Sequence, residues 1–114
     1  MQRRFLRLAI VNRGEPAMRL TRAIKPDISV WLHQPYGITV PSDGVSAKLV
    51  RRYAKLSGLP VRRLPPYRGT ATGWQNALLG NHGAFVAELP AGRPSARLIR
   101  ANVRAIRSVA FRGA

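Results

Sequence analysis

His33 and Glu88 are the residues of this 114-residue chain that are best placed to do chemistry, because each ends an apolar run. His33 follows the run 28–32, and Glu88 follows the run 84–87. A lone carboxyl group among apolar neighbours costs free energy unless it is partnered or used. Histidine is a usual ligand of Zn²⁺ and binds it through a nitrogen of the neutral imidazole ring. A carboxylate in partly apolar surroundings is suited to take a proton from a metal-bound water. The pair therefore indicates a candidate hydrolytic site.

Each residue also has an ordinary structural interpretation. His33 fits a buried imidazole with one hydrogen-bonded nitrogen, and Glu88 fits a strand-end carboxylate paired with one of the many arginines. Position favours function, because ligands of open α/β sheets bind beyond the carboxyl ends of the strands, where both residues fall. We therefore expect the two side chains to share one cleft. The second histidine, His82, lies in a Gly-Asn-His-Gly stretch and is interpreted as a solvated loop residue.

The segment 67–74 carries hydroxyl groups that could bind a ligand. Tyr67, Thr70 and Thr72 offer hydrogen bonds, and the two glycines among them allow a ligand to approach the backbone. By composition alone, a surface loop anchored by Trp74 is equally compatible. The segment is a candidate substrate-binding loop.

The hydrophobic pattern predicts an α/β fold with a small, partly parallel sheet and amphipathic crossover helices. A loop rich in Pro, Gly and Ser is expected over 34–43. The expected elements are a short strand or apolar turn at 5–11, helices at 15–24, 45–56 and from 94–95 onward, a helical turn at 74–79, and strands at 28–32 and 83–89. Two or three strands make a thin sheet with unpaired edges, which indicates part of a larger domain.

The last predicted helix separates apolar from basic positions. Ile99, Val103, Ile106 and Ala110 are expected to form its inner side, and Arg97, Arg100, Arg104 and Arg107 its outer side.

The net charge of +16 is mostly arginine and leaves two long stretches, 26–47 and 69–92, without a basic residue. Such a charge could attract nucleic acid, anionic lipid or an acidic cell-wall polymer, whereas the structural alternative is a solvated arginine face. A small nucleic-acid- or polyanion-binding module is the less favoured function, because no nucleic-acid motif is present and aromatic residues are not interleaved with the basic clusters.

The sequence has no clear membrane-spanning or targeting segment. No apolar run is long enough to span a membrane. The basic start is followed by an apolar stretch too short for a signal peptide, so the default expectation is a cytoplasmic protein. The chain has no cysteine, which excludes disulfides and thiolate ligands.

Three blocks in this order resemble the C-terminal half of bacterial zinc carboxypeptidase-type metallopeptidases, most of all the murein peptide amidase-like branch. They are 26–35 (PDISVWLHQP), 67–76 and 84–90 (AFVAELP), and the resemblance covers about residues 26–110. It implies zinc as cofactor with His33 as a ligand, Glu88 as the catalytic glutamate, and a substrate pocket lined by the loop that holds Tyr67, Thr70 and Thr72. It also implies a peptide or cell-wall peptide as substrate.

The chain departs from that family upstream. The family draws its first two zinc ligands from an H-x-x-E motif, which this sequence lacks, and one histidine cannot form a three-ligand site. We therefore expect residues 26–114 to be the C-terminal half of a carboxypeptidase-like domain that is inactive alone. The chain is then a truncated gene product, one half of a split protein that a missing N-terminal half would complete, or a decayed copy. Whether the chain is an enzyme is left open by its sequence.

Residues 5–23 carry a second, shorter resemblance. The stretch 8–20 (LAIVNRGEPAMRL) is similar to the opening strand and helix of biotin carboxylases. It implies that residues 1–25 form a strand-helix segment that is foreign to the rest, and it implies no function alone.

Overall fold

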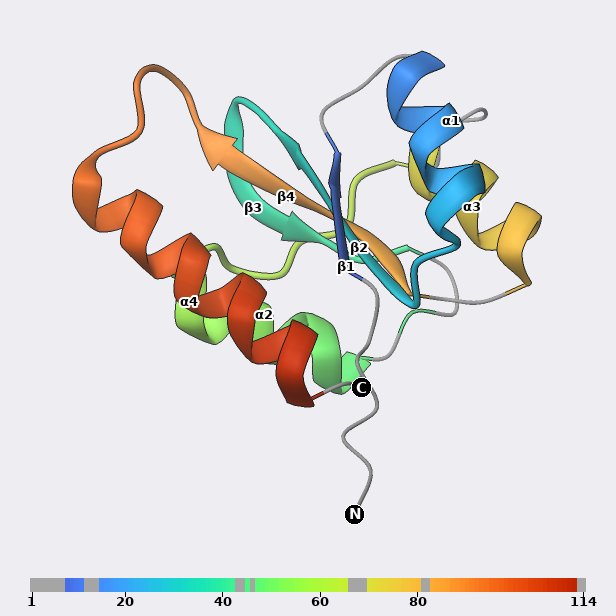
Figure 1. Cartoon of the computed structure of the whole chain (residues 1–114). Coiled ribbons are helices and arrows are strands. Elements are labelled where there is room, and N and C mark those ends of the chain that lie inside the picture. The colour runs from blue at the N-terminus through green and yellow to red at the C-terminus, as the bar shows by residue number, and fades with distance from the viewer. Residues whose placement is uncertain are drawn as a thin grey trace.

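The computed structural model is an α/β fold built on one mixed four-stranded sheet (Figure 1). It describes residues 8–11, 15–42, 45, 47–65, 70–80 and 83–112. The elements are β1 (Leu8–Val11), α1 (Glu15–Ile24), β2 (Ile28–His33), β3 (Tyr36–Val40), α2 (Ala47–Ser57), α3 (Ala71–Leu79), β4 (Ala84–Pro90) and α4 (Ala96–Arg112). The expected fold class is confirmed.

The strand order is β1-β2-β4-β3. β1 runs parallel to β2, β2 runs parallel to β4, and β3 runs antiparallel to β4. The two central strands, β2 and β4, are apolar over most of their length, as strands covered on both faces should be. Their parallel pairing brings their carboxyl ends to the same edge of the sheet.

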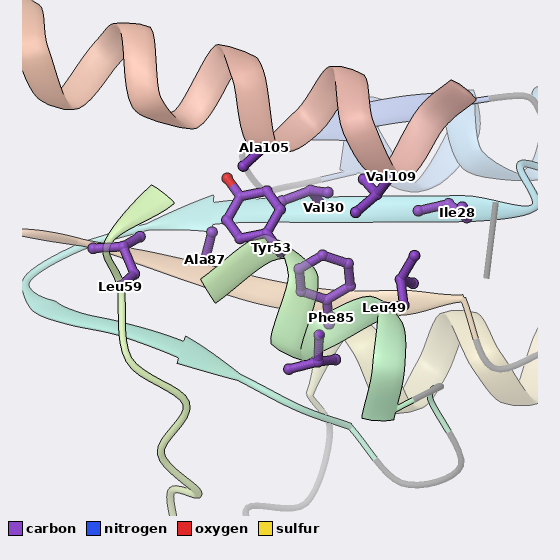
Figure 2. Close-up of a cluster of buried hydrophobic side chains, with 10 residues drawn as sticks. Ile28, Val30, Leu49, Tyr53, Leu59, Phe85, Ala87, Ala105 and Val109 are labelled. Carbon is purple, nitrogen blue, oxygen red and sulfur yellow. The ribbon is translucent and has the colours of Figure 1, made fainter. Parts of the chain in front are cut away.

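Helices α2 and α4 lie side by side over one face of the sheet, and α1 and α3 lie over the other (Figure 1). The larger core fills the space under α2 and α4, where the rings of Tyr53 and Phe85 meet edge to face with centroids 5.2 Å apart (Figure 2). The Tyr53 hydroxyl donates a 2.7 Å hydrogen bond to Oδ1 of Asn102, so the polar groups that join the two helices are satisfied. Burial raises the pKa of Tyr53, because the charged phenolate would lose its hydration.

The opposite face is held by side-chain amides of α3. The Trp31 indole N–H donates a 2.9 Å hydrogen bond to Gln75, and the Gln75 amide donates in turn to the Ser29 hydroxyl. The next residue, Asn76, accepts a 3.1 Å hydrogen bond from the backbone N–H of Ala84, where β4 begins. These buried bonds fix α3 against β2 and β4.

Two expectations about the elements were wrong. The expected loop at 34–43 contains the edge strand β3, which pairs with β4 although Pro35 and Pro41 flank it. Prolines are tolerated at edge strands, so they mark the ends of this strand rather than exclude it. On α4, Ile99 and Val103 are 51% and 48% exposed, so they do not form the inner side. That side consists of Asn102, Ala105 and Val109, with Leu98 and Ile106 partly buried beside them. The helices otherwise match their expected places to within a few residues.

Across the described ranges, no helix is both long and apolar enough to cross a membrane.

Candidate functional site

The sheet register places His33 directly beside Glu88. In the parallel pairing of β2 with β4, Ser29 is opposite Ala84 and each later pair follows in step, so the last pair is His33 with Glu88. Side chains alternate between the two faces of a strand, and both residues fall on the face that also carries Trp31 and Val86. Two residues 55 positions apart in sequence therefore meet at the carboxyl edge of the sheet.

Nδ1 of His33 and Oε1 of Glu88 are 3.1 Å apart, which is a hydrogen bond. An ionised carboxylate only accepts hydrogen bonds, so with Glu88 ionised the proton lies on Nδ1 of His33 and is donated to Glu88. The lone pair of a neutral His33 then lies on Nε2. Metal-binding histidines commonly have this arrangement, in which one ring nitrogen donates to a carboxylate and the other is free to coordinate.

The two side chains differ sharply in exposure. The His33 side chain is 52% exposed, whereas that of Glu88 is 7% exposed. A solute arriving from solvent therefore meets the imidazole first and finds the carboxylate behind it.

The second carboxylate oxygen of Glu88 has no partner. Oε2 is buried and makes no hydrogen bond within the described part of the chain. Leaving a buried polar atom unpaired costs about 1–3 kcal/mol, and more for a charged group. The alternative interpretation, in which an arginine pairs with Glu88, does not hold among these residues, since the recorded partner of its carboxylate is the His33 ring. Such an unpaired buried oxygen calls for an explanation, and a catalytic role or a bound water or ion is among those that buried unsatisfied groups have.

The donor set does not by itself fit a complete zinc site. A zinc centre takes three or four protein ligands. Apart from the masked positions, no group of three or more His, Cys, Asp or Glu side chains gathers anywhere in the structure, so His33 and Glu88 stand as a pair. The orphan oxygen and the exposed imidazole match part of a metal site, and further donors would have to come from elsewhere.

Gln34, which the sequence interpretation passed over, ties the ends of the central strands together. Its side-chain amide donates hydrogen bonds of 2.9 Å to the carbonyl of Pro90 and 2.8 Å to that of Gly92. These two bonds lie immediately after His33 on β2 and just after Glu88 on β4. Gln34 therefore helps to hold the two candidate residues at a fixed separation. In the sequence, the position of Gln34 directly after His33 could have indicated that it belongs to the site.

The candidate substrate-binding residues are placed less directly. Tyr67 lies outside the described residues. Thr70 is exposed and caps α3, because its hydroxyl oxygen accepts a 3.1 Å hydrogen bond from the backbone N–H of Gly73. Thr72 is buried in the first turn of α3. Neither threonine makes a hydrogen bond with His33 or Glu88, so a role for this loop in substrate binding stays a prediction. His82 also lies outside the described residues.

Comparison with solved structures supports the expected kind of fold. The chain is similar to the crystal structure of murein-tripeptide amidase MpaA from Escherichia coli O157, with a TM-score of 0.57 and 22% sequence identity. The likeness covers 80% of this chain and 39% of that one, so the chain spans well under half the length of the protein that it matches. At this identity the match shows a shared fold.

The remaining comparisons found nothing. No model of a known protein family matches the chain, and no curated protein matches it. The resemblance of the N-terminal stretch to biotin carboxylases is not supported by any of these findings.

Proposed function

We propose that this chain supplies the part of a carboxypeptidase-like hydrolase that carries His33 as a zinc ligand and Glu88 as the general base. The observation that carries the proposal is the meeting of the two side chains at the carboxyl edge of the parallel strands, with one oxygen of Glu88 unpaired. The fold shared with a murein-tripeptide amidase supports peptides, including those of murein, as the substrate class. The missing zinc donors would come from a segment with the H-x-x-E motif, which this sequence lacks, so we expect the chain alone to be inactive.

The residues in hand define what this half would contribute. Glu88 would receive a proton at Oε2, which has no hydrogen-bond partner among the described residues, while Oε1 is held by the His33 ring. Positioning of this kind matters because a general base must lie within hydrogen-bond reach of the proton that it takes. Gln34 keeps the two strand ends together, so the base stays at a fixed distance from the imidazole. Zinc, when bound, would polarise the scissile carbonyl and lower the pKa of its bound water.

The test follows the ring resonances of the histidines by NMR while Zn²⁺ is added to the full chain. We expect the His33 resonances to shift at zinc concentrations that leave those of His82 unchanged, because His33 has a carboxylate beside it. In the same preparation, a murein tripeptide should show no hydrolysis above the rate with zinc alone.

Two variants make the test specific. His33→Ala should abolish the tighter zinc response, whereas His82→Ala serves as the matched control and should retain it. If zinc reaches millimolar concentration without moving the His33 resonances, the assignment of a ligand role to His33 is wrong. If the chain alone cleaves the peptide and Glu88→Gln cleaves it equally fast, the assignment of Glu88 as the base is wrong.

A further inference from the structure

The outer side of the α2–α4 layer carries seven exposed basic side chains. On α2, the exposed basic side chains are Lys48, Arg51 and Lys55, and the buried residues Leu49, Val50 and Tyr53 lie on the other side of the helix. On α4, the exposed basic side chains are Arg97, Arg100, Arg104 and Arg107. The two helices lie side by side on one face of the sheet (Figure 1), and the seven side chains are exposed on the sides of these helices away from their buried residues. We call this the α2–α4 basic face.

Nothing in the described structure neutralises this face. Neither helix contains an acidic residue. The ion pairs that the structure records engage Arg19 with Glu15 and His33 with Glu88, and none engages the seven side chains of the α2–α4 basic face. Grouping so many like charges costs repulsion, which a bound polyanion would relieve.

The four arginines of α4 form a stripe whose length suits a phosphate backbone. They recur at intervals of three or four residues, which keeps them along one side of a helix. From Arg97 to Arg107 the helix rises about 15 Å, because each residue adds about 1.5 Å. One strand of a duplex carries a phosphate about every 3.4 Å, so the stripe would span about four phosphates. Guanidinium groups bind phosphate through two parallel hydrogen bonds, which lysine cannot do.

We infer that the α2–α4 basic face binds the backbone of duplex nucleic acid without sequence preference. A single strand fits less well, because such sites stack bases on aromatic side chains and the exposed aromatic residue of these two helices is Phe111, at the end of α4. An anionic membrane is the competing partner, because α4 also exposes Ile99, Val103 and Phe111. We favour the duplex because the spacing of the four α4 arginines matches the phosphates of one strand, and vesicle binding is measured against it.

This surface is independent of the candidate catalytic pair. Val30 and Leu32 of β2 face the core under α2 and α4, so by strand alternation Trp31 and His33 lie on the opposite face of the sheet. Binding at the α2–α4 basic face would therefore leave the half-exposed His33 ring uncovered. The inference goes beyond the proposed hydrolase function and does not depend on it.

The experiment measures binding of the full chain to a fluorescent 20-base-pair DNA duplex by anisotropy at several salt concentrations. With about four phosphates neutralised, the logarithm of the binding constant should fall against the logarithm of salt with a slope of about −3.6, or about 150-fold between 50 and 200 mM. A second duplex of unrelated sequence should bind equally well.

The variants locate the site. Replacing the four α4 arginines with glutamine (R97Q, R100Q, R104Q and R107Q together) should reduce affinity at least tenfold and flatten the salt slope, with the fold checked by circular dichroism. The matched control removes four charges from exposed positions outside α2 and α4 (R19Q, K25Q, R62Q and R63Q together) and should weaken binding much less.

Three results would overturn the inference. The first is an equal loss of duplex affinity in the two variants, and the second is no duplex binding at 50 mM salt. The third is that the chain binds phosphatidylserine vesicles more tightly than the duplex, and that the α4 variant abolishes this vesicle binding. Glu88→Gln should bind the duplex like the unmodified chain, which separates this test from that of the hydrolase proposal.

Discussion

Glu88 should limit the stability of the fold, because its buried Oε2 has no partner within the part of the chain that the structure describes. Replacing Glu88 with methionine keeps an unbranched side chain of similar length and removes the unpaired oxygen. Removing the unpaired Oε2 should raise the free energy of unfolding by about 1–3 kcal/mol, and losing the hydrogen bond to His33 should lower it by about 0.5–1.5 kcal/mol. We therefore expect Glu88→Met to raise the free energy of unfolding by about 1 kcal/mol.

The assay is chemical and thermal unfolding followed by circular dichroism. For a domain of this size, 1 kcal/mol corresponds to a rise in Tm of about 4 °C. His33→Ala is the matched control, because it removes the same hydrogen bond but keeps the buried carboxylate. Oε1 of Glu88 then also loses its partner, so the free energy of unfolding should fall by about 1–3 kcal/mol. A fall of more than about 1 kcal/mol in Glu88→Met would refute the reasoning, since it would show that the carboxylate stabilises the fold rather than being kept for function.

Three further predictions concern the framework that positions the site. Gly83→Ala should lower the free energy of unfolding by about 1–3 kcal/mol or more in urea denaturation, because the added Cβ would lie 1.8 Å from the carbonyl oxygen of Asp27. Gln75→Leu should cost about 1–3 kcal/mol in the same assay, because it leaves the buried indole N–H of Trp31 without an acceptor; an unchanged midpoint would contradict the role of this bond. Burial raises the pKa of Tyr53, so its contribution to the free energy of unfolding is fully present below pH about 10 and is lost as the pH rises above that value, where Tyr53 of the unfolded chain ionises. In Tyr53→Phe the free energy of unfolding should fall less steeply over the same pH range, as measured by urea denaturation at fixed pH values.

The sequence predicted the central strands and the helices because their patterns are local. An apolar run of strand length, or apolar residues at helical spacing, follows from burial of that element alone. The pairing of His33 with Glu88 was also predictable, since each residue ends a central strand of a parallel pair and such ends meet at one edge.

The parts that sequence could not give depend on neighbours. The edge strand β3 carries β-forming residues at Tyr36, Ile38 and Val40, but Pro35 and Pro41 beside it indicate a loop, so its hydrogen bonds to β4 are what define it as a strand. On α4, the apolar positions cover a wider arc than the core occupies, so only the packing shows that Ile99 and Val103 are exposed while Asn102 is buried against Tyr53. Whether Oε2 of Glu88 has a hydrogen-bond partner likewise depends on the residues packed around that atom, which the sequence alone does not give.

The central claim, that His33 and Glu88 form one half of a zinc hydrolase site, is tested most directly by a crystal structure of the chain grown with Zn²⁺ and measured at the zinc absorption edge. The account predicts an anomalous peak about 2.0–2.1 Å from a ring nitrogen of His33, on the same edge of the sheet as Glu88, that disappears in His33→Ala. Zinc bound only at other positions, with His33 still engaged solely with Glu88, would contradict it.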